Sequence, residues 1–300
     1  MGRLAVIIIL ILATNGCLHA QFNPNHDGNK GWTRQNATRS DQIFHPESAM
    51  TEYAHSGNVS LFTESRFGLT NRIELSTHLA FNVFQPNIKA KIRWNTHFKN
   101  WIIASKINLG NAYPGLSIAK RNFNDIVAAD AVIPVVVEAG HELIASRVFK
   151  HDANCSDGNE WLVLTGSIGT YLGMRFKKGD VEMIPKHFLY NRSTVLVRSN
   201  FLASMKLWAD WKALRRLHVH GGFRLQSWQA KKNIAFEAQA EAEMFLNVSC
   251  SIHAGCALSA ANYKTTSNRI GVLPIIDFTY YIGKEKKQEK TLFNPNGHLY

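Results

Sequence analysis

The stretch that decides the fold class is residues 58–83, NVSLFTESRFGLTNRIELSTHLAFNV, in which apolar side chains recur at odd positions. Those positions hold Val59, Leu61, Phe67, Leu69, Ile73, Leu75, Leu79, Phe81 and Val83. Polar side chains such as Arg66, Glu74 and His78 lie between them. Because successive side chains of a strand point to opposite faces, the stretch predicts two strands joined by a turn at Thr70 and Asn71.

One face of this predicted hairpin carries charges that a packed core would accept only with partners. A sheet that closes into a tube, apolar outside and polar inside, suits both faces. Nine later stretches alternate in the same way: 88–94, 101–109, 135–146, 161–176, 195–211, 217–225, 236–246, 250–258 and 272–282. Single-chain bacterial barrels have even strand numbers. We therefore predict an all-β, antiparallel up-and-down transmembrane β-barrel of about twelve strands (range about 10–14), the missing strand lying near Ser48 to Tyr53.

The N-terminus has the order of a secretory signal peptide. Arg3 precedes an apolar run from Leu4 to Ala13, which is too short to span a bilayer as a helix, and cleavage is expected after Ala20. Lipidation at Cys17 is an alternative, although Thr14 stands where a lipobox usually has an aliphatic residue. The expected organisation is a signal peptide (1–20), an N-terminal arm (21–57), a barrel (58–283) and a charged tail (284–300), exported to the bacterial outer membrane.

The formal charge of +12 is compatible with an anionic membrane surface, anionic solutes or nucleic acid. An exported chain without a zinc-finger, RNA-recognition or helix-turn-helix pattern does not fit nucleic acid. The expected partners are therefore outer-membrane lipid and small anionic solutes. Cys155, Cys250 and Cys256 remain after cleavage; their odd number implies no disulfide framework, and we expect small apolar side chains on the outer face.

The polar positions of the predicted strands give the candidate residues that face the lumen. Lys89, Lys91, Arg93 and Lys106 form a strip that would favour anions. A symmetric hairpin at 228–235 places His220 opposite Glu243 and Arg224 opposite Gln239. Glu237 and Glu241 then lie on the diagonals, which completes a ladder of opposite charges. The full set is Glu74, His78, Lys89, Lys91, Arg93, Lys106, Glu138, Glu142, Arg198, Lys206, Asp210, His218, His220, Arg224, Glu237, Glu241 and Glu243.

The same positions give little indication of a metal site or a catalytic site. His218 and His220 share a face, but no third ligand of the same phase lies nearby in sequence, so no metal site is expected. For a hydrolase, His141 beside Glu142 and Ser193 are candidates whose geometry the sequence does not fix. No glycine-rich phosphate loop and no Cys-x-x-Cys pair occurs. We predict no catalytic residue and no cofactor.

Residues 66–75, RFGLTNRIEL, resemble a hairpin common in exported bacterial outer-membrane barrels, aromatic-Gly-Leu-Thr-Asp-Arg-hydrophobic-Glu-Leu. They also resemble the outer-membrane transporter group linked to degradation of aromatic compounds, which implies a barrel and a role in transport. Such barrels often end on an aromatic residue that closes the last strand. Here Tyr280 and Tyr281 would close it, yet the chain continues to Tyr300.

The expected function is a narrow passive channel or a structural barrel without catalytic activity, since side chains largely fill so small a lumen. Two alternatives stay open. One is an outer-membrane enzyme or adhesin that uses the long loops 110–134 and 177–192, the first with a short helix at 116–123. The other is a soluble secreted ligand-binding barrel, which requires the apolar face to lie inside.

Overall fold

The computed structural model describes residues 45–82, 85–94, 101–111, 113–122, 130–150, 160–177, 179, 196, 199–214, 216–228, 233–247, 249–263 and 266–282. The predicted signal peptide, the predicted tail, Arg198, Ser193 and most of the loop 177–192 lie outside these residues.

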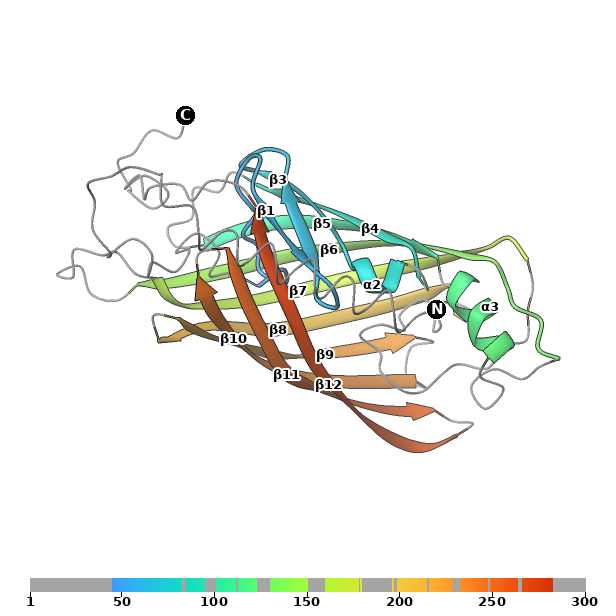
Figure 1. The fold of residues 1–300 in the computed structure, drawn as a ribbon. Coiled ribbons are helices and arrows are strands. Elements are labelled where there is room, and N and C mark those ends of the chain that lie inside the picture. The colour runs from blue at the N-terminus through green and yellow to red at the C-terminus, as the bar shows by residue number, and fades with distance from the viewer. Residues whose placement is uncertain are drawn as a thin grey trace, which may run out of the picture.

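Twelve antiparallel strands form one closed barrel, in which each strand pairs with its neighbours in sequence and β1 pairs with β12 (Figure 1). The predicted fold class is confirmed. The strands are β1 (Gly57–Ser60), β2 (Ser65–Gly68), β3 (Ile73–Thr77), β4 (Asn87–Arg93), β5 (Trp101–Asn111), β6 (Val136–Lys150), β7 (Glu160–Arg175), β8 (Phe201–Leu214), β9 (Leu217–Trp228), β10 (Asn233–Asn247), β11 (Cys250–Tyr263) and β12 (Thr266–Ile282).

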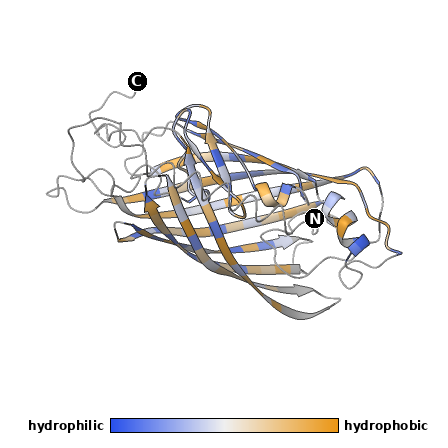
Figure 2. Cartoon of the chain, in the orientation of Figure 1, coloured by the Kyte–Doolittle hydropathy of each residue, from blue (hydrophilic) through white to orange (hydrophobic). Residues whose placement is uncertain are grey.

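Hydrophobic and hydrophilic residues alternate along the strands (Figure 2), and their exposure shows an apolar exterior and a polar interior. In the middle of the barrel wall, Ile168, Met205 and Phe236 are exposed. Their strand neighbours Lys206 and Glu237 point inward and are buried. The wall is thus apolar on the side that faces away from the lumen, as the pattern of two predicts.

The deciding stretch contains more elements than expected. Its first predicted strand is two strands, β1 and β2, and residues 79–82 form the short helix α2 (Leu79–Asn82) in place of a strand end. The carboxylate of Asp277 explains the early reversal, because it accepts hydrogen bonds from the backbone N–H groups of Leu61, Phe62 and Thr63 at 3.1, 3.1 and 2.6 Å. A carboxylate that satisfies three N–H groups stabilises a tight turn.

The twelfth strand therefore comes from this split and not from the N-terminal arm. Residues 48–53 form no strand; the nearest pairing is an isolated bridge between Ala54 and Gly68. The predicted register of the β9–β10 hairpin is wrong by two residues. Glu243 lies opposite His218, and Arg224 lies opposite Glu237. Phase survives a shift of two, so all these side chains still face the lumen.

The wall differs in height around the barrel. Strands β1 to β4 have four to seven residues, whereas β6 to β12 have twelve to seventeen. β12 pairs with β1 only through Thr279 to Ile282. Among the described residues, the earlier part of β12 has a paired strand, β11, on one side alone.

The predicted helix in the first long loop is α3 (Tyr113–Asn122), which begins three residues earlier than expected. Neither described helix is long and apolar enough to cross a membrane.

The prediction for Cys250 is wrong: its side chain is buried and disulfide-bonded. Cys256 is free and exposed on the outer face.

The Asp277 turn gives a test of barrel closure. Replacing Asp277 with Ala leaves three backbone donors without their acceptor, so the free energy of unfolding should fall by about 2 kcal/mol. Chemical denaturation followed by tryptophan fluorescence measures this change. Asp130→Ala, at an exposed position between α3 and β6, should stay within about 0.5 kcal/mol of the wild type. Equal stability of the two variants would contradict the role given to Asp277.

Candidate functional site: a filled, charged lumen

The structure buries most of the predicted lumen residues. His78 and Arg93 are half-buried, and Arg198 lies outside the described residues. The buried members are Glu74, Lys89, Lys91, Lys106, Glu138, Glu142, Lys206, Asp210, His218, His220, Arg224, Glu237, Glu241 and Glu243. A selective role for them stays a prediction.

Residues 45–56, which we call the inner segment, cross the lumen from β8 and β9 to the β2–β3 turn. At one end the ring of His45 stacks on Trp208 with centroids 4.7 Å apart. In the middle the backbone N–H of Ala49 donates to Ser146 Oγ at 2.8 Å. At the other end the N–H of Ala54 donates to Asn71 Oδ1 at 3.1 Å. The segment thus contacts opposite parts of the wall.

Glu47 of the inner segment lies at the centre of the largest ion-pair cluster. Lys206 contacts the carboxylates of both Glu47 and Glu142, the latter at 2.5 Å. Arg224 lies 3.1 Å from Glu47 and 3.4 Å from Glu237. Each of these cations therefore joins the inner segment to a carboxylate of the wall. Buried charges are tolerated only with such partners.

Tyr171 shows how the strands make room for this cluster. Its fully buried ring lies over Gly140, the residue directly opposite on β6, where an added Cβ would lie 2.2 Å from the ring. The Tyr171 hydroxyl donates to Glu142. Glycine at position 140 therefore lets a large side chain lie flat against the wall and orient a carboxylate.

A second cluster holds the other end of the inner segment. Arg66 lies 2.8 Å from Glu52, and Lys91 lies 3.0 Å from Glu74. The Lys91 ammonium also donates to the backbone carbonyl of Met50 at 2.9 Å. Basic residues of β2 and β4 are thus engaged by the inner segment and by β3.

The predicted anion-favouring strip is largely neutralised. Glu64, in the β1–β2 connection, contacts Lys89 and lies 3.3 Å from Lys106. His78 Nε2 lies 3.7 Å from the same carboxylate. Lys91 is paired with Glu74. The remaining member of the predicted strip, Arg93, is half-buried at the end of β4.

Sequence reasoning missed Glu47 and Glu52 as lumen residues, because they belong to an arm of weak periodicity in which no pattern marked them. The alternation does place Glu64 on the polar face of the predicted hairpin, although Glu64 is not in the candidate set.

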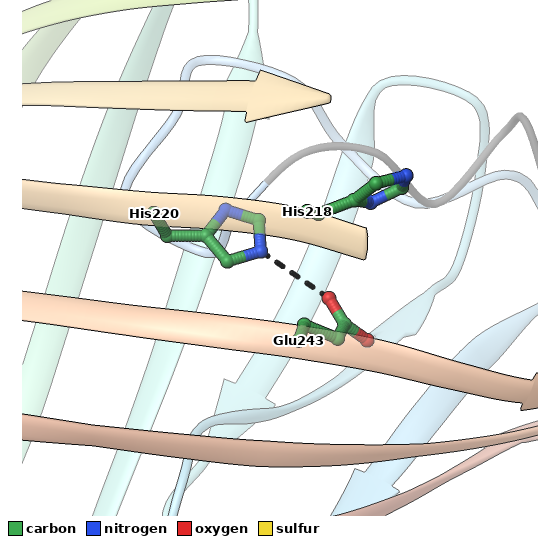
Figure 3. Close-up of side chains that lie close together, drawn as sticks. All are labelled: His218, His220 and Glu243. Atoms are coloured by element: carbon green, nitrogen blue, oxygen red, sulfur yellow. Dashed lines mark hydrogen bonds and ion pairs between the residues drawn. The ribbon is translucent and has the colours of Figure 1, made fainter. Parts of the chain in front are cut away.

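A third cluster contains the histidines. His220 lies between Asp210 on β8 and Glu243 on β10, with Nδ1 2.9 Å from Asp210 and Nε2 3.3 Å from Glu243. His218 lies beside them on the same strand (Figure 3). All four side chains are buried. The missing third partner of the histidine pair is thus Glu243, which is 23 residues from His220 in sequence.

The hydrolase candidates are not brought together. His141 is exposed on the outer face of β6, whereas the adjacent Glu142 points inward. Adjacent strand residues point to opposite faces, so they cannot act on one substrate. Ser193 lies outside the described residues.

The sequence matches no protein-family model and no curated protein. Among solved structures it is similar to in-vitro folded OmpT, an outer membrane protein of Vibrio cholerae, with 7% identity and a TM-score of 0.36. The match covers 73% of this chain and 63% of that chain. The OmpT of Vibrio cholerae expressed in the outer membrane gives 7% identity, a TM-score of 0.35, and coverage of 73% and 64%. The chain thus spans less than two thirds of these structures.

The Glu47 cluster predicts strong coupling between the inner segment and the wall. Lys206→Met removes the cation shared by two buried carboxylates and should lower the free energy of unfolding by about 3–5 kcal/mol. Combining it with Glu47→Gln should cost less than the sum of the two single changes, because one of the two carboxylates that lost this cation is then uncharged. Denaturant titrations of the four proteins give the coupling energy. Strict additivity would show that Glu47 and Lys206 do not interact.

Proposed function

We propose that the chain is an integral outer-membrane barrel that is closed to solutes at rest. It becomes a narrow channel for small ions and solutes when the inner segment leaves the lumen. The observation that carries this proposal is the pairing of Glu47 with Lys206 and Arg224, which places a segment across the lumen and binds it to the wall.

The exterior supports membrane insertion. Long strands of twelve to seventeen residues carry exposed Leu, Ile, Val, Met and Phe side chains outward. Water would be an unfavourable neighbour for a continuous apolar band of this kind. A soluble ligand-binding barrel has the opposite arrangement, with its apolar face inside. The order of the N-terminal residues 1–20 and the resemblance at residues 66–75 support export and transport.

The lumen supports a closed resting state. Ion pairs join the inner segment to β2, β8 and β9. Its own residues Ala49, Met50 and Glu52 are buried. Breaking any one of these ion pairs leaves a buried charge without that partner, which is unfavourable. Opening therefore requires a change that weakens several contacts together.

Membrane insertion predicts a depth-dependent cost of charge on the outer face. Ile168 is exposed in the middle of the sixteen-residue β7, so Ile168→Arg should destabilise the barrel in liposomes by about 2–4 kcal/mol. Phe176→Arg, just beyond the end of the same strand, should cost about 0–1 kcal/mol. Urea unfolding in liposomes, with tryptophan fluorescence as signal, measures both.

The gel mobility of boiled and unboiled outer-membrane fractions tests whether the protein is located in the outer membrane as a folded barrel. A wild-type protein found in that fraction, with a mobility shift on boiling, agrees with the proposal. A protein recovered as soluble in the periplasm without a shift, and indifferent to Ile168→Arg, would overturn it.

Closure by the inner segment predicts the electrical behaviour. The wild type should be nearly silent in planar bilayers, and Glu47→Lys should raise the open fraction about tenfold or more. Repulsion from Lys206 and Arg224 needs to supply only about 1.4 kcal/mol for that change. Asp130→Lys, an equal charge change at an exposed position, should leave the open fraction unchanged.

The possible recordings separate the two roles expected from the sequence. A wild type that conducts steadily would contradict closure by the inner segment. Silence of Glu47→Lys in a correctly inserted barrel would favour the structural role over the channel.

A further inference from the structure

We propose that His218, His220 and Glu243 form a binding site for one divalent transition-metal ion, with zinc as the expected occupant. One ligand atom from each of these three side chains lies within 4.8 Å of the other two (Figure 3). Two imidazoles and a carboxylate that leave a fourth position open are a frequent zinc ligand set.

Neighbouring strands place the three ligands on the lumen side of the wall. His218 and His220 are two residues apart on β9, so both point into the lumen. Glu243 lies directly opposite His218 on β10. His220 Nε2 and Glu243 Oε2 are 3.3 Å apart. Two ligands about 2.0–2.1 Å from a tetrahedral zinc ion are separated by roughly this distance.

His218 provides an independent sign of a missing ligand. Its side chain is 1% exposed, and within the described residues neither of its ring nitrogens has a hydrogen-bond partner. Its ring packs 4.8 Å, centroid to centroid, from Phe245. Buried polar groups are normally satisfied, because an unsatisfied group loses its hydration without compensation. A metal ion would satisfy one of these two nitrogens.

The surrounding groups orient the other two ligands. Asp210 holds His220 Nδ1 at 2.9 Å, which leaves Nε2 for a metal ion. Glu243 Oε1 accepts from Ser251 Oγ at 2.6 Å and from the Tyr281 hydroxyl. Its other oxygen, Oε2, faces His220. A carboxylate behind a ligating histidine and hydrogen bonds to a ligating carboxylate are the usual outer contacts of a metal ion.

Charge at the site also suits a divalent cation. Asp210 and Glu243 bring two carboxylates to the same part of the lumen. The same donor set binds Cu²⁺ and Ni²⁺, and intrinsic affinity in the divalent series peaks at Cu²⁺. The proposal is therefore for the class of ion, and zinc is the probe that tests it.

The position of the site relates it to the inner segment. His218 is the second residue of β9, next to the short β8–β9 turn. The ring of His45 lies 5.4 Å from that of His220. A metal ion bound here would lie beside the start of the inner segment, near the β8–β9 turn.

The test uses full-length protein without a histidine tag, stripped of metal and titrated with zinc chloride by calorimetry. Co²⁺ provides a second probe, since its visible spectrum reports tetrahedral coordination by nitrogen and oxygen. We expect one tight site in the wild type. His218→Leu should weaken that site about 100-fold or more, and Asp210→Asn should weaken it about 10–100-fold.

His218→Leu is the decisive variant because, within the described residues, the His218 side chain makes no hydrogen bond on which the fold depends, so the barrel should assemble. Removing an unsatisfied imidazole should leave the metal-free stability equal or higher. His141→Leu is the matched control, because it removes one exposed histidine of the outer face and should bind zinc as the wild type does.

Unfolding provides the second readout. Zinc should raise the denaturation midpoint of the wild type and of His141→Leu, and it should leave that of His218→Leu unchanged. The proposal is overturned if the wild type binds no zinc, or if His218→Leu binds it as tightly as the wild type. In that case His220 only bridges Asp210 and Glu243 as an ion pair.

Discussion

The need to give every buried charge a partner is the constraint on which this structure depends. The closed wall turns one side of each strand inward, and the sequence places Lys, Arg, His and Glu on that side. A charge taken out of water costs several kcal/mol unless an opposite charge or several hydrogen bonds replace the water. The lumen therefore has to be a network and cannot be a set of independent side chains.

The inner segment completes this network. Without Glu47, Lys206 and Arg224 would depend on wall carboxylates alone, and without Glu52 the same would hold for Arg66. A segment that supplies acids to basic residues of the wall is held more firmly than one bound by shape. Reversing the charge of Glu47 would weaken its contacts with Lys206 and Arg224 together, because both cations pair with the same carboxylate.

The low wall at β1 to β4 has a related cause. Asp277 of β12 ends β1 after four residues, because its carboxylate engages the backbone of the next turn. Glu64 then reaches the lysines of β4 and β5 from that turn. One short hairpin thus contributes to both barrel closure and charge balance. The histidine cluster lies in the taller part of the wall, on the long strands β8, β9 and β10, whose side chains converge there.

The sequence by itself determined the closed barrel, its approximate strand number and the face on which most strand side chains lie. Alternation with a period of two is a local property, and it survives a register error such as the one at His218 and Glu243. Tertiary structure alone decided the partners. Glu47 meets Lys206 across 159 residues. Where the barrel closes, Ser60 contacts Thr279 and the backbone of Leu61 contacts Asp277. Contacts at such separations depend on register, shear and closure of the whole sheet, which no local pattern records. The predicted hairpin already placed Glu243 across from His220, but only the structure brought Asp210 of β8 to the same imidazole.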